Sequence, residues 1–179
     1  GVIFASGGFS RNQEYRERFL PAPQQIDWTS SPVGQTGDLI GPFEKLDAKF
    51  GLMDKVWGAP SIIDHTGRPF FLVADRGIPN MIIVDQDGQR YINEPTPYHE
   101  FVDKMYEHNE ATGGKAITSW IILDGRAKSR YLFAGLFPMQ DFPKDYYEHD
   151  IVYKADNIAD LEQKLNIPFG NLQKTVERF

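Results

Sequence analysis

The chain has 179 residues, the size of one ordinary domain, and 41% of them are hydrophobic, which is enough to bury a core. A net charge of −6, with 25% charged residues and no basic or acidic run, argues against disorder and against a nucleic-acid partner. The absence of cysteine excludes disulfides and a cysteine nucleophile and fits a reducing compartment, so the cytoplasm is expected. No apolar run approaches the roughly 20 residues that cross a bilayer, so no membrane span is expected.

The first 51 residues predict a strand and two helices. Residues 2–5 are small and apolar and predict a buried strand that leads into a Ser6-Gly7-Gly8 turn. Ser10, followed by Gln13, resembles a capping box for a helix that ends before Pro21. After a loop over residues 21–37, a helix capped by Asp38 and ended by Gly51 is expected to pack its apolar face on the core. That face carries Leu39, Phe43, Leu46 and Phe50.

The central segment predicts strands followed by a helix. Apolar runs at 70–73, 81–85 and 90–93 read as strands, and Asp87-Gly88 between the last two is the strongest hairpin signal in the chain. Residues 99–110 then have helical character. Tyr98 therefore stands where a hairpin ends and a helix begins.

The C-terminal segment adds two short strands, at 120–123 and 151–153, and two helices. Asn157 caps the first helix, and apolar residues over 169–179 form the stripe of the second. Antiparallel strands dominate and strands do not alternate regularly with helices, so the fold class is predicted to be α+β: a mixed, mostly antiparallel sheet with packed helices.

Most signatures of chemistry are missing. There is no G-x-G-x-x-G fingerprint, phosphate-binding loop or G-x-S-x-G elbow, and the four histidines have no metal-binding spacing. The segment Asp85-Gln86-Asp87-Gly88 imitates the start of a calcium loop, but Thr96 stands where the bidentate glutamate belongs, so a hairpin turn is favoured and no metal is expected. The glycines of Ser6-Gly7-Gly8 and of residues 34–38 are explained as well by tight turns and a helix cap as by contact with a cofactor.

Tyr98 departs from the ordinary expectation that a tyrosine ring is simply packed in the core. Two prolines, Pro95 and Pro97, stiffen the segment that leads to it, and a junction between a hairpin and a helix can aim a side chain into a cleft. We therefore single it out as a candidate catalytic residue.

Several blocks of the sequence, in order, resemble one flavoprotein superfamily. Val2-Ile3-Phe4-Ala5-Ser6-Gly7-Gly8-Phe9 is similar to the V-x-x-A-[ST]-G-G-F strand of the fumarate reductase/succinate dehydrogenase flavoproteins, which include the 3-ketosteroid Δ1-dehydrogenases (3-oxosteroid 1-dehydrogenases). The similarity continues through Gly37-Asp38, the Leu52-to-Trp57 region, residues 82–94, residues 131–136, and the blocks 155–161 and 175–179. It thus covers nearly the whole chain and implies the catalytic-domain fold of that superfamily.

The residues after Asn93-Glu94 separate the branches of the superfamily. Fumarate reductases resemble N-E-x-x-x-R and use the arginine as catalytic acid, whereas the ketosteroid dehydrogenases resemble N-E-x-x-P-Y followed by M-Y, as in Pro97-Tyr98 and Met105-Tyr106. The T-E-x-x-R-G stretch of the fumarate reductases is also altered here, to Ala74-Asp75-Arg76-Gly77 at its end. The resemblance therefore favours the ketosteroid branch.

That branch implies introduction of a C1–C2 double bond into a 3-oxosteroid. Tyr98 is implied to take the proton α to the ketone, while FAD takes the hydride. Pro97, Tyr106 and Trp57 are implied to bind substrate, and Ser6, Gly7 and Gly8 to border the cofactor. The partner tyrosine and the oxyanion-binding groups of the family match no part of this chain, and neither does its FAD-binding domain, so the fragment alone is expected to be inactive and not to retain FAD.

The expected organisation has three parts. Residues 1–25 lead out of the missing FAD-binding domain, 26–166 form the catalytic or substrate domain, and 167–179 return toward the FAD-binding domain. Two alternatives stay open. A reductase of the same fold acting on another activated alkene or enone would need converging arginines and histidines if its substrate were a dicarboxylate, whereas a steroid needs an apolar pocket of roughly 300 Å³ or more. A non-catalytic binding or interaction domain would bury Tyr98 away from any cleft.

Overall fold

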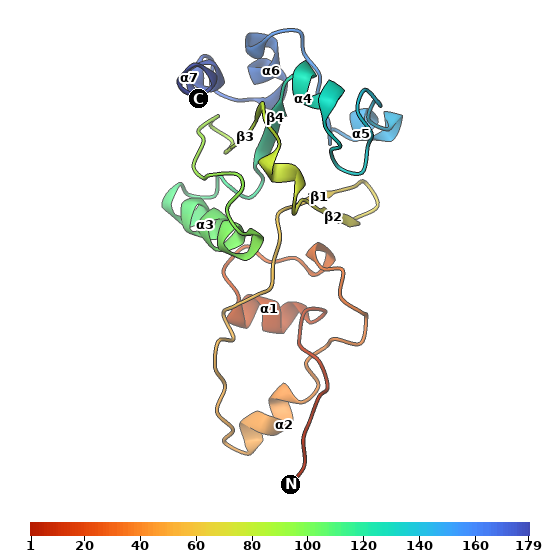
Figure 1. The fold of residues 1–179 in the computed structure, drawn as a ribbon. Helices are drawn as coiled ribbons and strands as arrows, with labels where there is room; N and C mark the ends of the chain where they lie inside the picture. The colour runs from red at the N-terminus through yellow and green to blue at the C-terminus, as the bar shows by residue number, and fades with distance from the viewer. The chain divides into compact units, whose positions relative to one another are not determined.

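The computed structural model describes residues 1–179, and its helices and strands are short (Figure 1). In chain order they are α1 Gln13–Phe19, η1 Ile26–Trp28, α2 Ile40–Lys45, β1 Ser61–Ile63, β2 Pro69–Phe71, η2 Asp75–Gly77, β3 Met81–Val84, α3 Tyr98–Ala111, β4 Trp120–Leu123, α4 Gly125–Arg130, α5 Lys144–Glu148, α6 Ile158–Leu165 and α7 Asn171–Arg178. The chain forms two compact units, residues 1–57 with 66–69, and residues 58–65 with 70–179. None of the helices has the length and apolar character needed to span a bilayer.

The first unit is organised around α1. Its N-cap is Asn12, whose side chain accepts a hydrogen bond from the main-chain N–H of Tyr15. The capping box predicted at Ser10 is therefore wrong by two residues, because Ser10 donates to Gln35 instead. The ring of Phe9 packs on those of Tyr15 and Phe19, with centroids 6.3 and 5.4 Å away.

Two predictions for the first unit are wrong. Residues 2–5 form no strand, and Ile3 is 94% exposed, because no other segment of the chain pairs with them. The predicted helix from Asp38 to Phe50 shrinks to α2. The Asp38 carboxylate accepts the Thr36 hydroxyl rather than a helix N–H, and Asp47 adopts a left-handed φ of +53° just beyond the helix. Leu46 is consequently 76% exposed rather than packed on the core, and Phe50 is exposed as well.

The core of the second unit surrounds the antiparallel pair of β3 and β4, in which Met81 pairs with Leu123 and Val84 with Trp120 (Figure 1). Every residue of β3 is buried. Ile82 and Val84 pack with residues of α6 and α7, whereas Ile83 packs with Phe101 of α3. A strand covered on both faces needs a continuous apolar run, which explains why β3 reads Met-Ile-Ile-Val without alternation.

The predicted third strand at 90–93 is wrong. Only one antiparallel bridge, between Val84 and Arg90, forms after the turn at Asp87-Gly88. The turn itself is present: the N–H of Gly88 donates to the carbonyl of Asp85, and Gly88 has a φ of +76°. A strand at 70–73 was also predicted; β2 forms at 69–71 and pairs with β1, which was not predicted.

The C-terminal helices follow the sequence more closely. Asn157 caps α6 by accepting the N–H of Asp160, as predicted. The last helix begins at Asn171 rather than at Phe169, which is 86% exposed. The buried carboxylate of Glu162 in α6 accepts the main-chain N–H of Gly170 and of Gln173, and so ties the two helices together.

The predicted strand at 151–153 is wrong. The N–H groups of Ile151 and Val152 both donate to the carbonyl of Tyr146, which makes this segment the turn that closes α5. Helices α4 and α5 were not predicted, since five or six residues are too few to show a helical period.

Candidate active site

Tyr98 is the first residue of α3, and the proline before it sets its place. Pro97 is the N-cap, and its carbonyl accepts the N–H of Phe101 at 2.8 Å, which closes the first turn. Just upstream, the N–H of Thr96 donates to the carbonyl of Asn93. Tyr98 is half-buried, and its ring lies edge-on to that of His99, with centroids 5.6 Å apart.

The buried face of α3 explains where Tyr98 lies. Phe101 and Met105 pack against Ile83 and Ile92. Tyr98 is seven residues before Met105, two helical turns away on the same face, so it stands at the end of the buried stripe. The other predicted residues of this region, exposed Pro97 and half-buried Tyr106, lie on the same helix or at its cap, with Tyr106 about 12 Å further along the axis.

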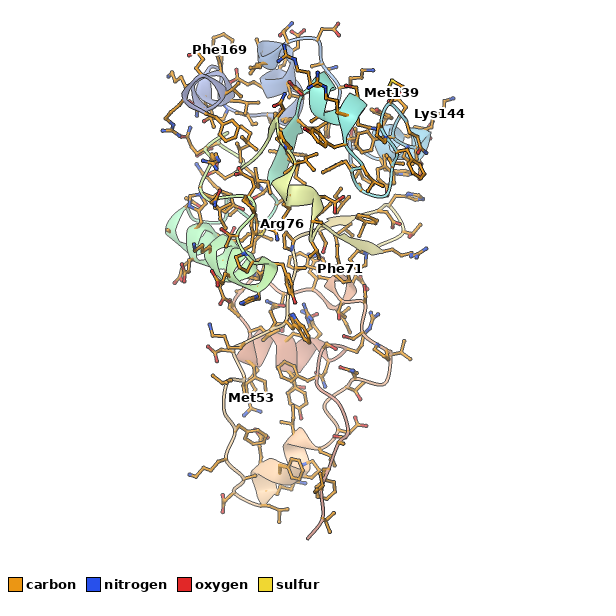
Figure 2. All side chains as sticks on the ribbon, in the orientation of Figure 1. Met53, Phe71, Arg76, Met139, Lys144 and Phe169 are labelled. Atoms are coloured by element: carbon orange, nitrogen blue, oxygen red, sulfur yellow. The ribbon has the colours of Figure 1, made fainter.

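Arg76 of η2 lies beside α3 and holds the segment that precedes Tyr98 (Figure 2). Its side chain is 2% exposed and donates to the carbonyls of Leu72 (2.6 Å), Val73 (3.4 Å), Glu94 (2.6 Å) and Thr96 (3.0 Å). Its guanidinium carbon lies 4.8 Å from the centre of the Phe101 ring. Burial lowers the pKa of Arg76, against the opposing charge of Asp75. Sequence reasoning missed this role; an arginine flanked by apolar runs was the available signal.

Arg90 is also paired within the protein. Its guanidinium forms a two-pronged pair with Glu94, at 2.8 and 2.6 Å, and stacks 4.9 Å from the centre of the Phe179 ring. Burial raises the pKa of the Glu94 carboxyl, but the hydrogen bonds from Arg90 and from the Ile83 N–H outweigh it, and the net shift is downward. Neither arginine near the motif points a free guanidinium at a substrate carboxylate.

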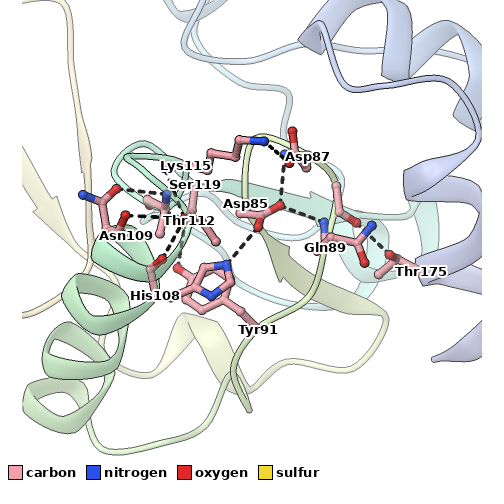
Figure 3. Close-up of polar contacts among 12 residues, drawn as sticks. Asp85, Asp87, Gln89, Tyr91, His108, Asn109, Thr112, Lys115, Ser119 and Thr175 are labelled. Carbon is pink, nitrogen blue, oxygen red and sulfur yellow. Dashed lines mark hydrogen bonds and ion pairs between the residues drawn. The ribbon is translucent and has the colours of Figure 1, made fainter.

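The far end of α3 is fixed by a polar network around Asp85 (Figure 3). One carboxylate oxygen of buried Asp85 accepts the N–H groups of Asp87 and Gln89, and the other lies 2.9 Å from Nε2 of His108. The His108 ring stacks on Tyr91, with centroids 4.4 Å apart. Asp85 thus closes a turn and anchors a helix, which accounts for the segment that imitates a calcium loop. No cluster of three or more His, Asp or Glu side chains that could hold a metal is present.

Further contacts anchor α3 from the segment that follows it. Asn109 Oδ1 accepts the N–H groups of Ala116 and Ile117. The Tyr91 hydroxyl is 2.8 Å from that of Ser119, and burial raises the pKa of Tyr91 to about 12 although this hydrogen bond opposes the shift. The helix that carries Tyr98 is therefore held along its whole length.

The remaining predicted residues belong to the first unit. Ser6, Gly7 and Gly8 are exposed, and Gly7 adopts a left-handed φ of +80°. The Gly8 carbonyl accepts the N–H of Gly37, which fixes the turn. A glycine turn with bare, exposed backbone lets a flat cofactor approach closely, so these residues fit one edge of an FAD site. Trp57 is 87% exposed.

Two cavities of the second unit are not lined by any predicted site residue. One of about 450 Å³ is lined by polar and charged residues with a few apolar ones, among them Asp87, Lys115, Trp120 and Asn166. A second, of about 250 Å³, lies between Arg90, Thr175, Arg178 and Phe179. Neither has the apolar lining expected for a steroid, and Tyr98 lines neither of them.

Comparison with known proteins identifies the family. A family model described as an FAD binding domain matches residues 1–177. The chain belongs to the FAD binding domain family. The match covers the glycine turn at residues 6–8.

Several proteins that are similar to the chain are steroid dehydrogenases. The 3-oxosteroid 1-dehydrogenase of Mycobacterium tuberculosis is 39% identical over the whole chain, and that of Mycolicibacterium smegmatis is 38% identical. The crystal structure of 3-ketosteroid Δ1-dehydrogenase from Sterolibacterium denitrificans, in complex with 1,4-androstadiene-3,17-dione, superposes on 99% of the chain with a TM-score of 0.87 and 34% identity. The chain spans about a third, 32%, of the length of each of these proteins.

Proposed function

We propose that this chain is the catalytic, substrate-side part of a longer FAD-dependent 3-ketosteroid dehydrogenase that introduces a C1–C2 double bond into a 3-oxosteroid. The 39% identity to 3-oxosteroid 1-dehydrogenases over the whole chain supports the reaction, and the 32% coverage of those proteins supports a larger parent. The finer fold assignment, an α+β catalytic domain of the fumarate reductase type with the three-part division at residues 25 and 166, belongs to the same proposal.

The observation that carries the proposal is the position of Tyr98 at the start of a helix that is anchored along its length. As phenolate, Tyr98 accepts the proton from the carbon α to the ketone, and the electron pair of that C–H bond becomes the new C=C bond. Bound FAD supplies the acceptor for the hydride that leaves the neighbouring carbon. A base on a rigid element keeps its oxygen within reach of one carbon, which is what selective proton removal requires.

The other roles follow from the same reading. Pro97 and Tyr106, at the cap and on the shaft of α3, are proposed to contact the steroid, as is exposed Trp57. Ser6, Gly7 and Gly8 are proposed to hold one edge of the FAD, because their backbone is exposed. The apolar pocket that a steroid needs is proposed to be completed by the part of the protein outside this chain.

Reduction of a dicarboxylate is disfavoured by the two arginines near the motif. The N–H groups of Arg76 donate to main-chain carbonyls, and Arg90 is paired with Glu94. A dicarboxylate site needs guanidinium groups that face the substrate. A non-catalytic domain would enclose Tyr98 in the core, whereas Tyr98 is half-buried.

The test is steroid dehydrogenation by the full-length protein with an artificial electron acceptor. Tyr98→Phe removes only the hydroxyl and is expected to lower kcat by about 100-fold or more. Tyr153→Phe is the matched control, since Tyr153 packs on Trp120 away from α3, and it should keep kcat within about twofold of wild type. Unchanged turnover in Tyr98→Phe would show that Tyr98 is not the base.

Cofactor retention by the isolated chain is a separate test. One edge of a site holds FAD weakly, so the purified chain is expected to lack the flavin absorption bands after gel filtration with FAD. Stoichiometric flavin on the chain would contradict this.

A further inference from the structure

Arg76 is a buried cation whose hydrogen bonds all go to main-chain carbonyls. Two of these carbonyls, of Leu72 and Val73, lie next to β2. The other two, of Glu94 and Thr96, lie 18 and 20 residues after Arg76. A buried charge is costly unless it is well solvated by hydrogen bonds. A fold that keeps this charge therefore depends on the two segments being held at one distance.

The segment 94–97 needs such a partner because of its prolines. Pro95 and Pro97 have no N–H, so the segment can donate to the rest of the protein only through residues 94 and 96. The side chain of Glu94 is held by Ile83 and Arg90, and the main chain of the segment is held mainly through its carbonyls. Arginine is the side chain suited to this, since it offers five N–H donors in a fixed planar fork, whereas lysine offers a single point of attachment.

Arg76 also reaches the first turns of α3. Its guanidinium lies over the ring of Phe101, which is 1% exposed, while its Nη1 atom holds the carbonyl of Thr96. Tyr98 is two residues after Thr96 and three before Phe101. The Arg76 guanidinium thus contacts the backbone two residues before Tyr98 and the packed ring of Phe101 three residues after it.

We infer that Arg76 is a positioning residue for the base: the Arg76 guanidinium, clamped to the carbonyls of Glu94 and Thr96 and stacked on Phe101, sets the location of the Tyr98 hydroxyl relative to the substrate. This rests on the proposed function of Tyr98. It assigns to Arg76 an architectural use of its donors rather than contact with substrate or a part in proton transfer.

The test uses the full-length protein and three variants. Arg76→Met keeps the length of the side chain and removes every donor, Arg76→Lys keeps the charge and loses the fork, and Thr175→Val is the control. Thr175 is equally buried and donates to the carbonyl of Gly88 at 2.7 Å, and both residues lie outside the segment 94–101 that Arg76 holds. Arg76→Met is expected to lower kcat by about 100-fold, the size of a misplacement of about 1 Å, with KM within about threefold. Arg76→Lys is expected to lose about tenfold, and Thr175→Val to stay within about twofold.

The kinetic isotope effect separates positioning from mere stability. A 3-oxosteroid deuterated α to the ketone should show a larger isotope effect on kcat in Arg76→Met than in the wild type, because a misplaced base makes proton removal slower. A protein that is only less stable has fewer active molecules, and its isotope effect does not change. An unchanged isotope effect in both Arg76 variants, with activity falling only in proportion to bound FAD, would overturn the inference.

Amide hydrogen exchange provides a readout that does not depend on activity. Peptides covering residues 94–101 should exchange faster in Arg76→Lys and Arg76→Met than in Thr175→Val. If Arg76→Met does not fold, Arg76→Lys alone decides by kcat, isotope effect and exchange. Faster exchange together with full turnover in Tyr98→Phe would mean that the proposed base is wrong while the clamp exists. Wild-type exchange in both Arg76 variants would mean that the clamp is wrong.

Discussion

The main-chain N–H of Ile83 in β3 donates to Oε1 of Glu94 at 3.0 Å. The Glu94 carboxylate therefore occupies a position on the free edge of β3 that a third strand would otherwise fill. The same carboxylate is paired with Arg90, and the main-chain carbonyl of Glu94 is held by Arg76. Glu94 thus joins the central strand pair to the loop that leads to Tyr98, through its side chain and its backbone.

Replacing Glu94 should make the free energy of unfolding less dependent on pH in the acidic range. Its folded-state pKa is lowered, so its contribution is complete above the pKa of the unfolded chain, about 4.3, and is lost as the pH falls through the lower folded-state value. Glu94→Gln is expected to cost about 1.5–3 kcal/mol at pH 7, and the difference from wild type should shrink below pH 4.3. Urea unfolding at pH 7, 5, 4 and 3 measures it.

Glu44→Gln is the matched control for Glu94. Glu44 pairs with Arg18 at 2.5 Å, but the two side chains are 33% and 49% exposed, so its loss is expected to cost clearly less than the loss of Glu94. An equal cost for the two variants at pH 7 would show that the buried contacts of Glu94 contribute nothing special.

The raised pKa of Tyr91 predicts that the protein loses stability at alkaline pH. Burial raises its folded-state pKa from 10 to about 12, so its contribution is complete below pH 10 and disappears as the pH rises from 10 to 12. Over that range the unfolding free energy of the wild type should fall more steeply than that of Tyr91→Phe, by at most about 3 kcal/mol. Parallel curves for the two proteins between pH 9 and 11.5 would contradict the burial of this hydroxyl.

Gly88 is expected to tolerate no side chain. Its φ is +76°, and an added Cβ would lie 2.8 Å from Cγ2 of Ile167 and 3.1 Å from the main-chain nitrogen of Leu172. Gly88→Ala should therefore cost about 3 kcal/mol, from backbone strain and overpacking together. Gly113 has a similar φ of +69° with nothing within 4 Å, so Gly113→Ala should show the strain alone, about 1 kcal/mol. Equal unfolding midpoints for the two variants would refute the clash.

Local signals were sufficient for several elements. The apolar run of β3, the cap at Asn157 and the periodic pattern of α3 each predicted an element that the structure contains. The signals failed where an element depends on a partner. Residues 2–5 and 90–93 have strand-like composition, but no strand of this chain pairs with the first, and the Glu94 side chain takes the place of the second.

The candidate site divides in the same way. Tyr98 could be singled out because the two prolines before it and the start of the helix lie close together in the sequence. The clamp by Arg76 could not, since it depends on an arginine meeting carbonyls 18 and 20 residues away, and a sequence does not show which carbonyls lack donors. The roles of all the predicted site residues, Tyr98 included, stay predictions.

Trp57 offers a test of substrate contact that stability does not confuse. Its side chain is 87% exposed, so Trp57→Ala should change the unfolding free energy by less than about 0.5 kcal/mol. If the indole covers the steroid in the full-length protein, its loss removes apolar contact made equally in the ground and transition states. KM should then rise by about tenfold while kcat stays within about threefold. Phe169→Ala is the control, because Phe169 is 86% exposed and has no assigned role, and it should leave both constants unchanged. A KM for Trp57→Ala equal to that of the control would remove Trp57 from the substrate site.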